Sequence, residues 1–427
     1  MFMIFLFLMI FTVIALKSRL NNGGLSLFLV FNITWLFAIF LAQLDLSSFG
    51  ELSVEIRLYL LCYLLFFNLA YIIFYLSFKD KLNLAFYDKY EFENLKNIAG
   101  LTKLSWMIWF SLFLVFIVTI ENEIGLFNFL FSGQARASIN EINNDAGVLI
   151  YYYIFGSLSC CITVYKSCFT KLSKIECIGI VVVLLSLLLT GAKINFITCI
   201  IMMFGVKYRL KYTNDIRLIY FGIIAVVLFY LFIILFSVFT GKAIDNDVGS
   251  LDSLNDLSSL TINVLLYPYD YAIGALYALD EKLFTHNSVI VEPYLPTILN
   301  KFYLIVNKVL GFEYISVNSS VLDFIEVGEV VTNVYTMHLA IINELSLLGA
   351  FLSSIVLGFV LSAVDYFSKM KRNFTVTFLY ASFLPVCVLS LVAYKFNDTI
   401  LYLSFLLLVC ALFKRIALLY VKQINME

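Results

Sequence analysis

The sequence is poor in charge, proline and histidine. Only 13% of its 427 residues are charged, four are prolines and two are histidines. Soluble domains carry about 25% charged residues, so this composition excludes an ordinary soluble fold. The 28 basic and 29 acidic residues nearly cancel and form no basic patch, which argues against a nucleic-acid partner. The eight cysteines contain no CxxC pair, and no metal or other cofactor is predicted.

Long apolar stretches make up most of the chain, which is 62% hydrophobic. A helix needs about 20 apolar residues to cross a hydrocarbon core of roughly 30 Å. The first stretch lacks the basic start of a signal peptide, so we interpret it as a helix. We predict an all-α polytopic membrane protein, a single integral domain over 1–427, with about eleven transmembrane helices. The stretches lie near 2–16, 25–44, 57–78, 104–120, 147–165, 175–190, 194–210, 216–240, 338–363, 374–394 and 399–418.

Basic residues gather in alternate loops between these stretches. Such loops stay in the cytoplasm, so the pattern predicts an external N-terminus and a cytoplasmic C-terminus. This orientation requires the segment 260–279 to be re-entrant or interfacial rather than spanning. It places a large loop, 241–337, outside the cytoplasm. The basic loops contain Lys17 and Arg19, Lys79 to Lys103, Lys166 to Lys174, Lys207 to Arg217, and Lys369 to Arg372.

The large loop is acidic and aromatic. From Gly241 to Thr336 it has twelve acids and four bases. Tyr267 and Tyr271 flank Asp270, and tyrosine rings beside carboxylates suit a sugar site, although tyrosines also form ordinary interfacial belts. The spacing in Pro296–Leu310 predicts a helix lying on the membrane. Asp245-Asn246-Asp247 has the spacing of a divalent-metal motif, but a solvated acidic loop is the favoured interpretation.

Two cations in the shorter predicted outer loops are functional candidates, because basic residues are rare on that side. Arg136 either pairs with Glu141 or Asp145, or clamps an anion, because a guanidinium binds phosphate in a forked geometry. Lys193 ends the turn TGAK after a short apolar arm, so it is expected to lie below the membrane surface. It either snorkels to the headgroups or serves a buried functional site, and we favour the functional interpretation.

The stretch after the large loop begins with two candidates for a general base. His338 is expected to be accessible and to titrate near neutral pH without a pKa shift. Glu344 lies about 120° around the helix, so the two cannot point straight into one site. It is either a base or a buried, protonated structural group. Small residues at every fourth position predict close packing of another helix, namely Ser346, Ala350, Ser354, Gly358 and Ser362.

Earlier spans contain few polar side chains. Asn32, Trp35 and Asn68 stand isolated among apolar neighbours, and we predict structural packing roles for them.

The order of these motifs resembles the O-antigen polymerase family, the repeat-unit polymerases of the Wzy-dependent pathway. The shared features are an arginine in an outer loop, the TGAK turn, a long external loop and TNVYTMHLAIINELSLLGAF at Thr332 to Phe351. The likeness is strongest at Asn333 to Thr336 and in the helix with Gly349. Family members often have Asp, Phe and Gly where this chain has Glu344, Leu345 and Ser346, so the glycine is lost.

A second motif of the family is a spacing between a basic residue and a glycine. Arg136 and Gly147 match the arginine-to-glycine spacing of these polymerases. Lys301 and Gly311 give a comparable spacing with lysine, which cannot form the same fork.

The resemblance implies a type C glycosyltransferase-like enzyme of the bacterial inner membrane. Such an enzyme transfers the growing polysaccharide from undecaprenyl diphosphate to a lipid-linked repeat unit at the periplasmic face. A chain-length regulator is an implied partner. O-antigen ligase and lipid-linked oligosaccharide flippase are the alternatives, although no internal repeat favours a transporter.

The implied chemistry assigns roles to ten residues. Cations would stabilise the diphosphate, a base would accept the acceptor proton, and polar aromatic residues would bind sugar. The expected residues are Arg136, Lys193 and Lys301 for diphosphate, His338, Glu344 and Asp270 for catalysis, and Tyr267, Tyr271, Asn333 and Tyr335 for sugar.

Overall fold

A computed structural model gives the fold of the chain. The structure describes residues 26–44, 51–85, 95–123, 125, 148–189, 193–210, 269–270, 273–285, 325–327, 330–332, 336–370, 373–392, 395 and 398–424.

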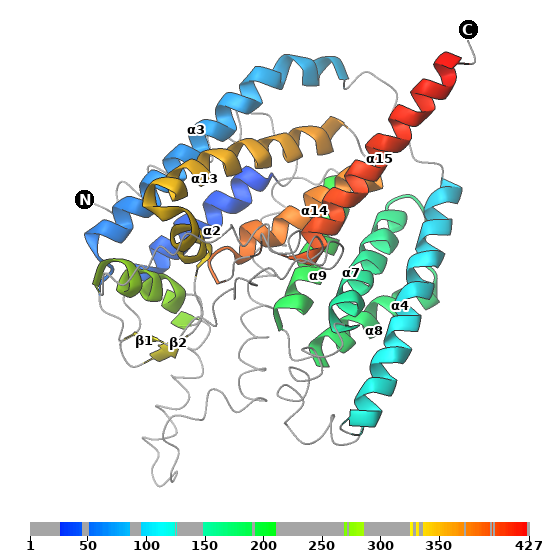
Figure 1. Cartoon of the computed structure of the whole chain (residues 1–427), viewed down its shortest axis with the longest axis horizontal. Helices are drawn as coiled ribbons and strands as arrows, with labels where there is room; N and C mark the ends of the chain where they lie inside the picture. Colours follow the sequence, from blue (N-terminus) through cyan, green and yellow to red (C-terminus); the bar gives the residue numbers. More distant parts are fainter. Residues whose placement is uncertain are drawn as a thin grey trace, which may run out of the picture. The chain divides into compact units, whose positions relative to one another are not determined.

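Nine of the eleven predicted stretches coincide with helices (Figure 1). The other two, near 2–16 and 216–240, lie outside the described residues, as does the predicted helix Pro296–Leu310. The nine helices are α2 (Leu27–Ala42), α3 (Val54–Ala85), α4 (Leu95–Glu123), α7 (Val148–Ser167), α8 (Lys174–Leu189), α9 (Lys193–Leu210), α13 (Met337–Met370), α14 (Phe374–Leu389) and α15 (Thr399–Ile424).

Three helical segments within the described residues are long and apolar enough to cross a membrane: Val54–Phe78, Ile98–Asn122 and Leu345–Lys369. Their large apolar side chains are widely exposed; Met107 is 69% and Leu348 71% exposed. Water would disfavour such continuous apolar surfaces, whereas lipid would not. The predicted helical class is therefore confirmed and these segments support a membrane protein, while the number of eleven spans stays a prediction.

The chain divides into two compact units, each built from distant parts of the sequence. Unit 1 contains Met1–Leu76, Thr213–Ser362 and Val386–Asn397. Unit 2 contains Ser77–Tyr212, Ala363–Pro385 and Asp398–Glu427.

In unit 1, α13 packs closely on α3 through its small residues. A Cβ atom added to Gly358 would lie 2.5 Å from the backbone oxygen of Phe67. One turn later, the Ser362 hydroxyl donates a hydrogen bond to the Tyr71 carbonyl over 3.1 Å. Ala350 and Ser354 on the same row are fully buried. The predicted small-residue packing face is confirmed.

Near its start, α13 contains one residue that is not helical. Ser346 has φ 65° and ψ 175°, a backbone conformation that residues other than glycine rarely adopt. The break brings Leu345 so close to Gly349 that a Cβ atom there would lie 2.5 Å from that of Leu345. A short buried segment from Met337 is thus set off from the membrane-crossing part of the helix.

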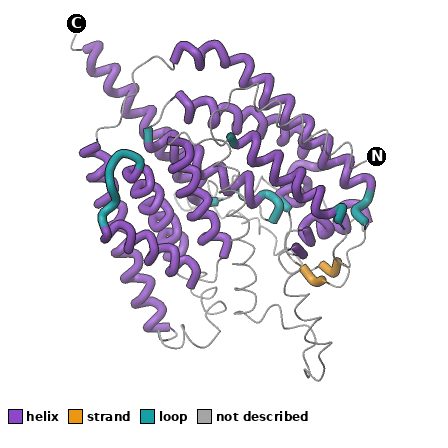
Figure 2. Tube along the Cα trace, turned by 180° about the vertical axis from the view of Figure 1, so that it is seen from behind, coloured by secondary structure: helices purple, strands orange, loops and turns teal. Residues whose placement is uncertain are grey.

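A small hairpin precedes α13. Strands β1 (Ile325–Val327) and β2 (Val330–Thr332) pair antiparallel, with Glu326 opposite Val331 (Figure 2, orange). The other regular elements among the described residues are helical, so the predicted all-α class holds apart from these six residues.

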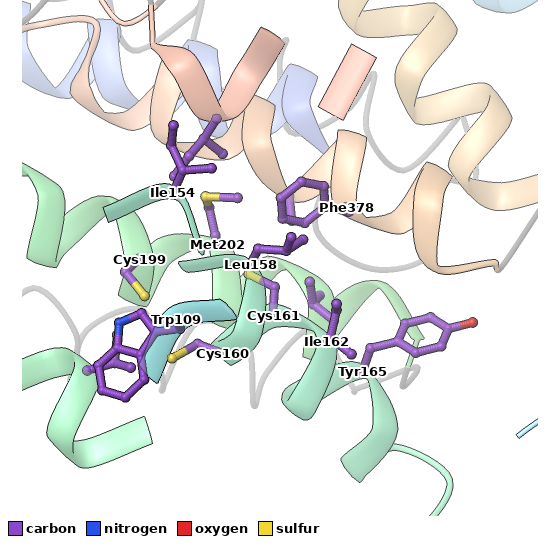
Figure 3. Packing of buried hydrophobic residues seen from close by; sticks show 14 of the residues in the cluster. Trp109, Ile154, Leu158, Cys160, Cys161, Ile162, Tyr165, Cys199, Met202 and Phe378 are labelled. Carbon is purple, nitrogen blue, oxygen red and sulfur yellow. The ribbon is translucent and has the colours of Figure 1, made fainter. Parts of the chain in front are cut away.

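In unit 2, α7 lies at the centre of a hydrophobic core (Figure 3). Side chains of α4, α9 and α14 meet it, with Trp109, Met202 and Phe378 among them. At the end of α7, Lys166 forms a 2.6 Å ion pair with Glu176, which also accepts a hydrogen bond from the Ser173 backbone. This reciprocal arrangement of Ser173 and Glu176 is a capping box that begins α8.

Unit 2 also contains a buried ion pair. Arg209 lies 3.7 Å from Asp365, and neither side chain is appreciably exposed. The guanidinium stacks over the Tyr380 ring at 4.4 Å and donates to the Ser368 hydroxyl. The pair connects α9 to α13 and α14.

Candidate functional site

One end of unit 1 brings together the end of α2, the start of α3, the start of α13 and the turn after α14. The Met337 N–H donates to the Ser390 carbonyl over 2.8 Å, which ties the start of α13 to that turn. Hydrogen bonds fasten the described part of the large loop to the same end.

Two tyrosines attach the large loop to the end of α2. The Tyr269 hydroxyl donates to the Leu41 carbonyl over 3.0 Å, and the Tyr277 hydroxyl donates to the Ala42 carbonyl over 3.3 Å. The last carbonyls of a helix have no partner within it, so hydroxyl donors satisfy them well. These two tyrosines are structural anchors. Tyr267 and Tyr271, the ones predicted to bind sugar, lie outside the described residues.

A buried carboxylate fastens the same loop to the start of α3. Asp280, 8% exposed, accepts hydrogen bonds from the backbone N–H of Ser53, over 2.7 Å, and from its hydroxyl. The Ser53 hydroxyl in turn caps α3 by accepting from the Ile56 N–H. Immediately after Asp280 the chain forms a π-helical turn, η1 (Glu281–Thr285), a rare conformation found often at functional sites.

Asp270 directly follows the anchor Tyr269, but its carboxylate does not have all its hydrogen bonds. Its side chain is partly buried, and Oδ1 is enclosed without a hydrogen bond from any described residue. Burial raises the pKa of this carboxyl to about 6. A carboxyl group with a pKa near neutral can exchange a proton with a substrate, which fits its predicted role as a general base.

His338, the other leading base candidate, is enclosed instead. Only 1% of it is exposed, so the expectation that it is accessible is wrong. Its Nδ1 lies 2.9 Å from the Tyr59 hydroxyl, and the rings of Trp35 and Tyr63 stand edge-on to the imidazole, with ring centres 4.4 and 4.3 Å away. Trp35 is therefore not isolated, because it forms one wall of this enclosure.

The remaining predicted site residues are only partly placed. Glu344 lies in α13 two residues before the break at Ser346, and Lys193 is the first residue of α9, but their side chains are not described. Outside the described residues lie Arg136 with its alternative partners Glu141 and Asp145, the second cation Lys301, the motif Asp245 to Asp247, and the sugar candidates Asn333 and Tyr335.

Lys395 is a candidate that the sequence analysis does not single out. It is only 9% exposed, in the short connection between α14 and α15. Lysine is seldom buried without a specific role. The sequence could have indicated Lys395, because the connection between α14 and α15 is predicted to lie on the outer side of the membrane. Basic residues are rare on that side, where Arg136 is also predicted to lie.

Asp398 in unit 2 is a second polar residue that the sequence analysis does not single out. It caps α15 by accepting from the Ile400 N–H over 3.1 Å and accepts from the Tyr153 hydroxyl over 3.3 Å. Its place directly before an apolar stretch is the sequence signal of a helix cap.

Among the described residues, no three His, Cys, Asp or Glu side chains cluster as metal ligands would. No protein-family model, curated protein or solved structure matches the chain.

Proposed function

We propose that this protein is an O-antigen polymerase. It would transfer a growing polysaccharide from undecaprenyl diphosphate to the non-reducing end of a lipid-linked repeat unit, at the periplasmic face of the bacterial inner membrane. The motif resemblance suggests the family. The observation that carries the chemistry is Asp270, a partly buried carboxyl whose pKa is raised to about 6 in a loop anchored to the helix ends.

Asp270 supplies the base in this reaction. The acceptor hydroxyl gives its proton to the carboxylate while its oxygen bonds to the anomeric carbon of the growing chain. The bond from that carbon to the diphosphate oxygen breaks, and the diphosphate leaves with the electron pair. A base with a pKa near the working pH combines a large ionised fraction with useful proton affinity. Glu344 is the alternative base.

The leaving diphosphate needs positive charge, because its negative charge grows in the transition state. Arg136, Lys193 and Lys301 are proposed for this role on the strength of their positions in the sequence. Tyr267, Tyr271, Asn333 and Tyr335 are proposed to bind the saccharide. A chain-length regulator is the proposed protein partner.

The proposal is tested by the lipopolysaccharide ladder of cells that lack the gene. We expect the ladder to disappear while one repeat remains attached to core, and a plasmid copy of the gene to restore it. Polymer accumulating on undecaprenyl diphosphate with bare core would instead identify a ligase. Bare core with single units trapped at the cytoplasmic face would identify a flippase, and either outcome would overturn the proposal.

A further inference from the structure

Two basic side chains gather around one buried carboxylate in unit 2, where α9 and α13 end. Arg209, in the last turn of α9, pairs with Asp365 of α13 and also donates to the Asp365 carbonyl and the Ser368 hydroxyl. Lys369 follows one helical turn after Asp365, so the two share a face of α13. Its ammonium lies close enough to interact electrostatically with both Arg209 and Asp365. This cluster of described residues therefore holds two cations against one carboxylate.

The guanidinium of Arg209 has more hydrogen-bond donors than the described residues use. It carries five N–H groups. Both of its hydrogen bonds come from Nη2, whereas Nε is enclosed and finds no acceptor among the described residues. Only 4% of the side chain is exposed, and a buried donor without an acceptor is costly. The Tyr380 ring, 4.4 Å away, holds the guanidinium in place, so the remaining donors suit an anionic acceptor from a ligand.

The cluster lies where lipid headgroups are expected. Lys369 is the last residue of Leu345–Lys369, the part of α13 that is long and apolar enough to cross a membrane. The charge pattern predicts that this end faces the cytoplasm, where basic pockets between helices bind anionic headgroups. The stretches 207–211 and 366–372 contain no acid, and they add four more basic residues, Lys207, Lys211, Lys371 and Arg372.

We infer that Arg209 and Lys369 bind the phosphate of an anionic phospholipid at this end of unit 2. The guanidinium supplies directed N–H donors to the phosphate oxygens, and the ammonium adds a second positive charge. With Asp365 ionised, the described cluster has one net positive charge, which one phosphodiester neutralises. The bound lipid joins α9 to α13 and stabilises unit 2. This role is independent of the proposed reaction.

The test follows thermal unfolding of the full-length protein in detergent as phosphatidylglycerol is added, with phosphatidylcholine and inorganic phosphate as separate arms. We expect phosphatidylglycerol to raise the unfolding midpoint in a saturable way, because a ligand that binds only the folded state stabilises it. Phosphatidylcholine has the same phosphodiester but no net charge, so it should have a much smaller effect. Lys369→Gln should need about tenfold more phosphatidylglycerol for half the full shift, as loss of one charge-assisted contact does.

Lys171→Gln is the matched control, because Lys171 is exposed on the same predicted side and the substitution removes the same charge. It should respond to phosphatidylglycerol as the wild type does. The double variant Arg209→Gln/Asp365→Asn removes both members of the ion pair, so no buried charge is left without its partner, and it should lose the response.

Three outcomes would overturn the inference. The first is equal stabilisation by phosphatidylcholine and phosphatidylglycerol, which would show a general effect of lipid. The second is a Lys369→Gln protein that keeps the wild-type response to phosphatidylglycerol. The third is an equal effect of inorganic phosphate at the same concentration, which would assign the site to free phosphate rather than lipid.

Discussion

The side-chain amide of Asn32 on α2 donates a hydrogen bond to the amide oxygen of Asn68 on α3 over 2.8 Å, and the Asn68 amide donates back over 3.0 Å. Asn32 also donates to the Phe28 carbonyl, and both amides are buried. In a membrane, such reciprocal pairs hold helices together. The structure confirms the predicted structural role of these asparagines. They are not isolated, however, because they form hydrogen bonds with each other.

Replacing either asparagine alone should destabilise unit 1 more than replacing both. Asn68→Leu leaves the buried amide of Asn32 without its main partner, at an expected cost of about 1 kcal/mol. The double variant Asn32→Leu/Asn68→Leu removes both polar groups and should recover much of the loss. Thermal unfolding in detergent of the four proteins in this cycle measures the coupling. If the stability losses of the two single variants simply add in the double variant, the hydrogen bonds between Asn32 and Asn68 contribute nothing to stability.

The contact between α3 and α13 should depend on Gly358 having no side chain. In Gly358→Ala the new methyl group meets the backbone oxygen of Phe67 at 2.5 Å, and backbone cannot rotate away. We expect a loss of about 1–3 kcal/mol, as for other overpacked sites. Gly100→Ala in α4 is the control, since nothing lies within 4 Å of its added Cβ. That variant should be neutral or more stable, because alanine favours helix.

Ser346→Gly should stabilise the protein. The φ of 65° and ψ of 175° at this position suit glycine, and strain of this kind typically costs about 1–3 kcal/mol. Relief of the strain should exceed the extra chain entropy of glycine in the unfolded state, which is about 1 kcal/mol or less. Thermal unfolding should show a higher midpoint for Ser346→Gly and no gain for Ser346→Ala, which keeps the Cβ atom. A lower midpoint for the glycine variant would contradict the strain.

Polymerisation should depend on pH through Asp270. Burial raises its pKa to about 6, so the carboxylate is ionised above this pH and protonated below it. Since only the ionised form accepts a proton, kcat should fall as the pH drops through about 6. Asp270→Asn should lose most activity at every pH. The control Asp280→Asn should mainly lower stability, because Asp280 anchors the loop to Ser53. Full activity of Asp270→Asn would assign the base to another residue.

Arg136 and Lys193 should both be needed for long polymer. Without either cation the departing diphosphate loses stabilisation, so Arg136→Ala and Lys193→Ala should leave a single repeat on core. Arg136→Lys should also be impaired, because lysine keeps the charge but not the fork. The ladder on a gel reports each variant, and normal chain lengths in both alanine variants would refute the assignment.

The sequence predicted the helices and one packing face because both depend on local spacing. The lengths of the apolar stretches predicted nine of the described helices. The four-residue repeat of small side chains predicted a close helix contact on α13, which the structure shows to be with α3. Both signals lie within a single helix, so they need no knowledge of the partner.

The enclosure of His338 could not be predicted, because its walls come from far along the chain. Tyr59 and Tyr63 lie four residues apart and so share a face of α3, but this spacing does not say what they face. The hydropathy of the sequence at the start of α13 does not indicate that the Tyr59 hydroxyl lies beside His338 Nδ1. The break at Ser346 was also missed, because serine, unlike proline or glycine, does not signal a helix break.

Helices of very different length share unit 1, so one bilayer thickness would not match both α2 and α3 if both cross it as predicted. Capped at both ends, α2 has 16 residues and is about 24 Å long, whereas the 25-residue apolar segment of α3 measures about 37 Å. The two are packed together through Phe28 and Tyr71. With α2 crossing the membrane as predicted, the long helix would have to tilt, or the lipid beside α2 would have to thin. The acyl-chain length of the surrounding lipid should therefore alter the stability of this unit.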